Sequence, residues 1–167
     1  MSNHEIADSP DKNSTKTRHF LYKKAIDLLS RREHSRAELG QKLRLKSSAE
    51  EELVDALLPD VLDELTQLGY LSNERYAEMI VRSRFEKGHG PVRIRLELKQ
   101  KGIESALVSE SLDAFDADWF ALAATVQRKR FGESPVDMAA RAKQMRFLSS
   151  RGFSSDQIDY ALSGREE

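Results

Sequence analysis

The chain has 167 residues, with 27 Lys and Arg and 28 Asp and Glu, so its formal net charge at pH 7 is -1. This near-zero net charge argues against a protein that binds nucleic acid through net charge alone. It has no cysteine, which excludes disulfides and thiolate metal sites and agrees with a reducing cytosol. No apolar run approaches the length of a membrane span, and the N-terminus has no apolar signal core, so we expect a cytoplasmic protein.

Three helices are predicted to follow a polar N-terminal segment. Residues 1–16 have almost no apolar side chains to bury, so we expect a disordered tail. A helix is predicted over residues 17–31, a capping box at Ser35 opens a second helix, and another at Ser48 opens a third, which Pro59 kinks or splits. The side chains expected in the buried faces are Phe20, Leu21, Ala25, Leu28 and Leu29, then Leu39 and Leu43, then Leu53, Leu57, Val61 and Leu65.

The middle of the chain is predicted to hold three more helices. Ser72 or Asn73 caps the first, and Gly88 and Gly90 end it. Pro91 suits the first turn of the next helix, where its missing N–H is not needed. The expected buried residues are Tyr76, Ile80 and Val81 in the first helix, Ile94 and Leu98 in the second, and Leu107, Val108 and Leu112 in the third, which begins at Glu104.

The last part of the chain is predicted to form three helices as well. One begins near Ala117, with Trp119 as a core anchor rather than a platform for stacking bases. Ser134 and Pro135 are expected to start the next, and a capping box at Ser154 opens the last. The expected buried residues are Trp119, Leu122, Val126, Ile158 and Leu162. No stretch alternates like a strand, so the prediction is nine helices and no sheet.

Three predicted helices end in a glycine that is followed by a large apolar residue. In a Schellman stop the glycine takes a left-handed conformation, and the next residue packs on the one five positions earlier, which is a leucine at all three stops. The stops are Gly69-Tyr70, Gly102-Ile103 and Gly152-Phe153, preceded by Leu65, Leu98 and Leu148. They predict an all-α fold of three tandem three-helix repeats, residues 17–71, 72–115 and 116–167, forming an elongated, curved stack. The alternative is a single irregular helical bundle with chance similarity.

Charge alternates along these repeats. The charged residues of segments 20–47, 82–101 and 128–151 give +5 each, whereas those of 50–78 and 104–118 give -8 and -5. Repeats stacked in the same sense would have a basic face, typical of proteins that bind phosphate-rich partners, and an acidic face suited to a basic protein surface. The alternative is a set of solvated helix faces whose charges pair between neighbouring helices.

The central turn Gly88-His89-Gly90-Pro91 is surrounded by basic residues. Backbone N–H groups at a helix start favour anions, but the Lys-Ser/Thr of a P-loop is missing, so nucleotide hydrolysis is not expected. We expect Gly88, Gly90, Pro91 and Gly102 to be structural turn residues. The partner-binding or DNA-binding residues inferred from charge and position are Arg82, Arg84, Lys87, Arg93, Arg95, Lys99 and Lys101.

The remaining polar residues form no recognisable catalytic or metal-binding motif. The chain has four histidines without metal-ligand spacing, acidic residues in surface runs, and no Ser-centred nucleophile elbow. We therefore expect no catalytic site, no metal and no cofactor. Leu96 lies opposite Ile94 on its helix, so it either packs on another repeat or is an exposed partner contact, and of the two we expect packing.

Residues 69–103, GYLSNERYAEMIVRSRFEKGHGPVRIRLELKQKGI, resemble the central segment of the RecX family of bacterial regulatory proteins, and the likeness extends from about residue 18 to the end. The resemblance implies an all-helical, three-repeat protein without enzymatic activity or cofactor. Members of the family lie in the groove of the RecA filament on single-stranded DNA and suppress its ATPase, strand-exchange and coprotease activities, which modulates DNA repair and the SOS response. Some also bind DNA directly.

On this resemblance we expect a monomeric negative regulator of the RecA filament, with single- or double-stranded DNA as a second partner. The rival interpretation is a stand-alone helical protein that binds DNA or RNA. The near-zero net charge and the acidic helices count against that rival.

Overall fold

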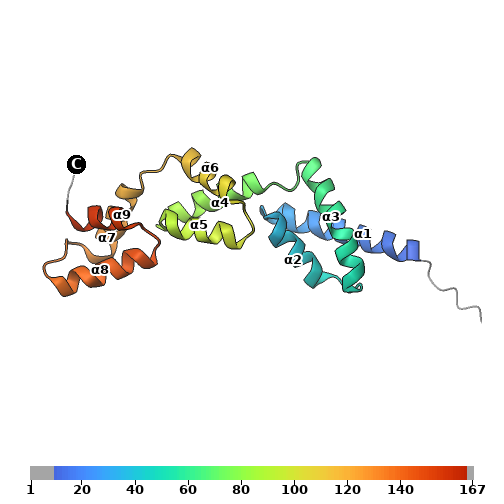
Figure 1. Ribbon diagram of the computed structural model, residues 1–167, viewed down its shortest axis with the longest axis horizontal. Helices are drawn as coiled ribbons and strands as arrows, with labels where there is room; N and C mark the ends of the chain where they lie inside the picture. Colours follow the sequence, from blue (N-terminus) through green and yellow to red (C-terminus); the bar gives the residue numbers. More distant parts are fainter. Residues whose placement is uncertain (1–9, 165–167) are drawn as a thin grey trace, which may run out of the picture. The chain divides into compact units, whose positions relative to one another are not determined.

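The computed structural model describes residues 10–164, and this part of the chain contains nine α-helices and no β-strand (Figure 1). The helices are α1 (Pro10–Arg31), α2 (Arg36–Lys46), α3 (Glu51–Gln67), α4 (Asn73–Glu86), α5 (Pro91–Gln100), α6 (Ser105–Phe115), α7 (Trp119–Phe131), α8 (Met138–Ser150) and α9 (Ser155–Leu162). The predicted all-α class is confirmed. We call α1–α3 repeat 1, α4–α6 repeat 2 and α7–α9 repeat 3.

The chain divides into two compact units, Met1–Tyr76 and Ala77–Glu167. The first unit contains repeat 1 and the first turn of α4, and the second contains the remainder of repeat 2 together with repeat 3. The sequence-based limits of the repeats and the elongated, curved stack stay predictions.

The core of the first unit lies where α1, α2 and α3 meet. Phe20 was expected in this core, but it is 41% exposed. In α3 the buried stripe contains Val54 and Leu58 in place of the predicted Leu53 and Leu57, which are half-buried. The helix has apolar residues on both sides of the predicted stripe, so docking against α1 and α2 selects the buried side. The fully buried side chains are Leu21, Ala25, Leu39, Leu43, Val61 and Leu65.

Two helix starts in the first unit differ from the predictions. Helix α1 begins at Pro10, so residues 10–16 are helical and not a tail, while residues 1–9 lie outside the described residues. Polar residues extend a helix at little cost once a buried face has nucleated it. Helix α3 begins after Glu50, which makes no side-chain capping hydrogen bond, so the predicted capping box at Ser48 is wrong. Pro59 lies inside α3 without splitting it.

The start of α8 is a further correction. Asp137 caps this helix, and its carboxylate accepts a hydrogen bond of 2.7 Å from the N–H of Ala140. The predicted start at Ser134 and Pro135 is wrong, because the aspartate that follows them is an equally good cap. The capping box at Ser154 is confirmed: its hydroxyl accepts from the N–H of Gln157, whose side chain accepts from the N–H of Ser154.

The buried residues of α7 also differ from those predicted. Ala123 and Gln127 are the buried residues of this helix, whereas Leu122 and Val126 are half-buried. Trp119 contacts the ring of Phe85 edge-on at 5.4 Å between centroids and lies 6.4 Å from Phe115. Trp119 therefore packs in an aromatic cluster between repeats 2 and 3, but it is half-buried and not one of the buried core residues that the sequence predicted.

The three predicted Schellman stops are all present. Gly69, Gly102 and Gly152 have φ values of +79°, +77° and +90°. The residue after each glycine donates its N–H to a leucine carbonyl five positions earlier, at 2.9 Å for Tyr70, 3.0 Å for Ile103 and 3.3 Å for Phe153. Helix α4 ends in the same way at Gly88, where the N–H of His89 donates to the carbonyl of Arg84 at 2.9 Å.

Repeats 2 and 3 meet at the end of α8 and the start of α5. The N–H of Gly90 donates to the carbonyl of Arg151 at 2.8 Å, and the N–H of Val92 donates to the carbonyl of Gly152 at 3.0 Å. These bonds satisfy N–H groups that a helix start otherwise leaves unpaired, and they align two helix dipoles head to tail. A Cβ atom on Gly90 would collide with the carbonyl of Gly152, and one on Gly152 would collide with Arg93. Both glycines therefore permit the close approach of the two backbones.

Candidate functional site

The structure brings four of the seven predicted basic residues together. They surround a surface cavity of about 510 Å³ on the side of repeat 2 where α4 faces α5. We call it the α4–α5 groove, and its principal lining residues are Arg84, Lys87, His89, Arg93, Leu96 and Lys101. The other three, Arg82, Arg95 and Lys99, do not line it.

Arg84 holds the two helices of the groove together. Its guanidinium donates two hydrogen bonds to the carboxylate of Glu97, of 2.8 and 2.6 Å. This pairing holds the pKa of Glu97 below its ordinary value, and the positive charge of Arg93 acts in the same direction. A bidentate pair of an arginine and a carboxylate holds the two side chains in one relative orientation. Arg84 therefore has a structural role in repeat 2, where it ties α4 to α5.

Arg93 and Arg95 lie on opposite flanks of α5. Arg95 donates a hydrogen bond of 3.0 Å to the hydroxyl of Ser109 on α6, away from the groove. Arg82 and Lys99 are exposed outside the groove. Lys87, Arg93 and Lys99 form no ion pair with any carboxylate in residues 10–164, so these three cations are available to a partner.

In repeat 1, unlike on α5, basic side chains form ion pairs with acidic side chains of a neighbouring helix. Arg36 and Arg44 of α2 pair with Asp63 and Asp55 of α3, each at 2.7 Å. Arg18 of α1 pairs with Glu64 of α3 at 2.6 Å. In this repeat the alternative interpretation holds, since basic and acidic helices neutralise one another. On α5, the second helix of repeat 2, Arg93 and Lys99 have no such carboxylate partner among the described residues.

The outward face of α5 is apolar beside the groove. Leu96 is 57% exposed and Val92, one turn before it, is 54% exposed. The predicted packing of Leu96 on another repeat is therefore wrong, and its exposure leaves the partner-contact interpretation. Cations next to an exposed apolar strip can bind an acidic protein surface or a phosphate backbone.

Sequence reasoning did not place His89 in the site. It lines the groove, and its Nδ1 atom is buried without a hydrogen-bond partner among the described residues. Burial lowers the pKa of His89, and the charges of Arg93, Arg151 and Arg84 lower it further. His89 is thus neutral at pH 7. No pattern in the sequence distinguishes a histidine that lines a groove from one that only forms part of a turn.

The central turn does not have free N–H groups for a phosphate. Those of Gly90 and Val92 donate to repeat 3, and Gly88 and Gly102 have positive φ where α4 and α5 end; the structural turn role of these residues and Pro91 stays a prediction. In residues 10–164 no group of His, Asp and Glu side chains is arranged to hold a metal ion. Within the same residues, no helix combines the length and apolar character of a membrane span.

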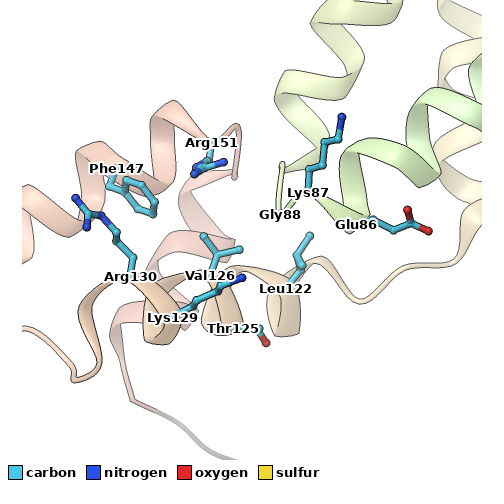
Figure 2. Close-up of a pocket in the computed structure, with 10 residues that line it drawn as sticks. All are labelled: Glu86, Lys87, Gly88, Leu122, Thr125, Val126, Lys129, Arg130, Phe147 and Arg151. Atoms are coloured by element: carbon cyan, nitrogen blue, oxygen red, sulfur yellow. The ribbon is translucent and has the colours of Figure 1, made fainter.

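A second cavity, of about 480 Å³, lies where the end of α4 faces α7 and α8 (Figure 2). We call it the junction pocket. Its apolar lining comes from Leu122, Val126 and Phe147, and its cations are Lys87, Lys129, Arg130 and Arg151. Sequence reasoning missed it, because Lys87 and the other three cations belong to different repeats and meet only through the junction.

Three family models match consecutive parts of the chain. Residues 22–58 match the model described as RecX, first three-helix domain. Residues 72–112 and 116–162 match the second and third three-helix domains of RecX.

Curated proteins named Regulatory protein RecX are similar over most of their length. The protein from Pseudomonas entomophila is 45% identical over 143 residues, which cover 85% of this chain and 89% of that protein. The protein from Pseudomonas savastanoi pv. phaseolicola is 48% identical over 142 residues, or 84% of this chain and 88% of that protein. The protein from Halorhodospira halophila is 40% identical over 144 residues, or 86% of each chain.

Solved structures share the fold. The crystal structure of RecX from Lactobacillus salivarius has a TM-score of 0.73 and 24% identity, covering 89% of this chain and 96% of that one. A crystal structure of regulatory protein RecX has a TM-score of 0.75 and 23% identity, covering 93% of this chain and 75% of that one. The three domain matches and the relatives at 40% to 48% identity show that the chain belongs to the RecX family of regulatory proteins.

Proposed function

We propose that this chain is a cytoplasmic, non-enzymatic negative regulator of a RecA-type recombinase. It binds in the groove of the RecA filament on single-stranded DNA and inhibits the ATPase, strand-exchange and coprotease activities. Through this inhibition it modulates DNA repair and the SOS response. The observation that carries the proposal is the match of all three RecX three-helix domains along residues 22–162.

The surface of repeat 2 supplies a physical route to such binding. Lys87, Arg93 and Lys99 are cations without ion-pair partners in residues 10–164, and the exposed side chains of Val92 and Leu96 lie on the same helix as two of them. We propose that this surface contacts either DNA phosphates or an acidic surface of the recombinase. Several modest interactions on one chain add through effective concentration, so no single interaction has to be strong.

The test is a titration of the protein into preformed RecA filaments on labelled single-stranded DNA. ATP hydrolysis reports inhibition, and fluorescence anisotropy reports binding. We expect loss of hydrolysis, together with tighter binding to filaments than to the same DNA without recombinase. Strong binding to bare DNA with no effect on hydrolysis would instead support the stand-alone nucleic-acid binder.

A further inference from the structure

The junction pocket exists because two repeats meet closely at glycines. A Cβ atom on Gly88 would lie 2.9 Å from the Cγ2 atom of Val126, so α7 packs directly against the turn after α4. The hydrogen bonds from Gly90 and Val92 to the end of α8 hold that turn from the other side. Glu86, Lys87 and Gly88 line the pocket from repeat 2, and its other lining residues belong to repeat 3 (Figure 2).

The charge of the pocket is strongly unbalanced. Lys87, Lys129, Arg130 and Arg151 line it, against the single carboxylate of Glu86. None of the four cations forms an ion pair with a carboxylate of the described residues. Like charges that line one cavity repel one another, so the pocket favours an anionic occupant that compensates them.

The floor of the pocket is apolar. Leu122, Val126 and Phe147 are each half-buried there, and they come from neighbouring turns of α7 and from α8. A cavity of about 480 Å³ has room for one or two large side chains. An apolar floor beneath a cationic rim fits a ligand that combines a bulky apolar group with carboxylates.

The ring of Phe147 disfavours a nucleobase as the occupant. The guanidinium carbons of Arg151 and Arg130 lie 5.3 and 5.9 Å from its centroid, and Phe131 packs edge-on at 5.3 Å. Binding of single-stranded nucleic acid relies on open aromatic faces for stacking. Phe147 is the one aromatic residue among those that line the pocket, and it is already packed on these three sides.

We propose that the junction pocket binds an acidic peptide segment of the partner protein, with a Leu, Ile or Phe side chain on the apolar floor and flanking carboxylates on the cations. The identification of the recombinase as the source of this segment rests on the proposed function, whereas the chemistry of the pocket does not. The pocket thus recognises a linear motif, and it shares Lys87 with the α4–α5 groove.

The first experiment selects peptides from a random twelve-residue library on the full-length protein. We expect enrichment of sequences in which at least two Asp or Glu flank a large apolar residue. The pocket variant is Thr125→Glu, which adds a carboxylate at an exposed pocket position, and its control is Ala121→Glu, an equal charge change at an exposed position of α7 outside the pocket. Thr125→Glu should weaken a selected peptide by about tenfold or more, and Ala121→Glu by less than about twofold.

A second pair of variants tests the cations. Lys129→Gln with Arg130→Gln should weaken the same peptide, whereas Lys143→Gln with Arg146→Gln, exposed residues of α8 outside the pocket, should not. Selected peptides without the acidic and apolar pattern, or equal effects of Thr125→Glu and Ala121→Glu, would overturn the proposal. So would loss of oligo-dT binding in the pocket variants with no peptide selected, which would assign the pocket to nucleic acid.

The filament assay then separates the two proposals. If the recombinase supplies the segment, Thr125→Glu should weaken inhibition of ATP hydrolysis while Ala121→Glu retains it. Inhibition that survives Thr125→Glu in a variant that has lost peptide binding would refute the recombinase as the source. A wild-type protein that binds the peptides but leaves the filament unaffected would instead refute the proposed function, and the peptide chemistry of the pocket would stand.

Discussion

At the scale of single residues, two histidines occupy equivalent turns before the second helices of repeats 1 and 2. His34 is almost fully buried, with its Nδ1 atom 3.0 Å from the carbonyl of Arg32 and its Nε2 atom 3.3 Å from the ammonium nitrogen of Lys42. This arrangement requires a neutral ring that donates from Nδ1 and accepts at Nε2. Burial lowers its pKa, and so do the charges of Arg32 and Lys42.

The lowered pKa makes stability depend on pH in a defined direction. Below the ordinary histidine pKa of 6.5, the unfolded chain takes up a proton that the folded chain resists, so the free energy of unfolding falls as pH drops. The stabilisation is complete above about pH 7. Glu97 does not interfere, because its lowered pKa acts only near and below pH 4.5. Urea unfolding at pH 7.5 and 5.5 should show a smaller difference for His34→Gln than for the wild type, and an equal difference would contradict the neutral-ring assignment.

Substitutions of Gly132 and Gly152 distinguish the energetic cost of backbone strain from the cost of disturbing close packing. Gly132 and Gly152 both have positive φ, of +80° and +90°, but a Cβ atom on Gly132 meets nothing within 4 Å while one on Gly152 would collide with Arg93. Gly132→Ala should therefore cost about 1 kcal/mol from strain alone. Gly152→Ala should cost about 3 kcal/mol or more, because the junction must open. Denaturant unfolding monitored in repeat 3 measures both, and equal losses would mean that the junction is not tightly packed.

At the scale of helices, the sequence predicted where helices are and how most of them end, and it was less successful with their starts. Glycine stops are local, since a left-handed residue and a hydrogen bond to a leucine carbonyl need nothing from the remainder of the fold. Caps are more ambiguous, because several Ser and Asp residues near a helix start compete. At α8 the cap is Asp137 rather than Ser134, and at α3 the helix begins past Ser48.

Ser154 and Ser48 were both predicted to cap a helix, and their substitutions can be compared directly. Ser154 makes both hydrogen bonds of its capping box, whereas Ser48 is exposed and caps nothing, since Glu50 is the N-cap residue of α3. Ser154→Ala should destabilise α9 by about 1 kcal/mol. Ser48→Ala should change stability by less than about 0.5 kcal/mol. Amide hydrogen exchange of α9 and α3 provides the measurement, and a large effect at Ser48 would restore the capping box that the sequence predicted.

At the scale of the whole chain, the count of charges located the basic surface but could not say which charges pair with a carboxylate. Segments 20–47 and 82–101 have equal net charge, yet the α2 arginines pair with α3 while Lys87, Arg93 and Lys99 have no such partner in residues 10–164. Pairing depends on where side chains of different helices meet, which periodicity does not encode. The junction pocket was missed for the same reason.

The exposed cations of α5 lead to a prediction about binding to the filament. Arg93→Ala with Lys99→Ala removes two exposed charges and leaves Arg95, whose hydrogen bond to Ser109 ties α5 to α6. If these cations meet phosphates, binding should weaken about tenfold, and the slope of log affinity against log salt should fall by about 0.7 to 0.9 for each phosphate that is no longer neutralised.

Lys12→Ala with Lys23→Ala, two exposed cations of α1, is the matched control and should change neither quantity. A weaker affinity with an unchanged slope would mean that the surface meets protein apolar groups through Val92 and Leu96 rather than phosphates. Unchanged affinity and slope would remove this surface of α5 from the interface.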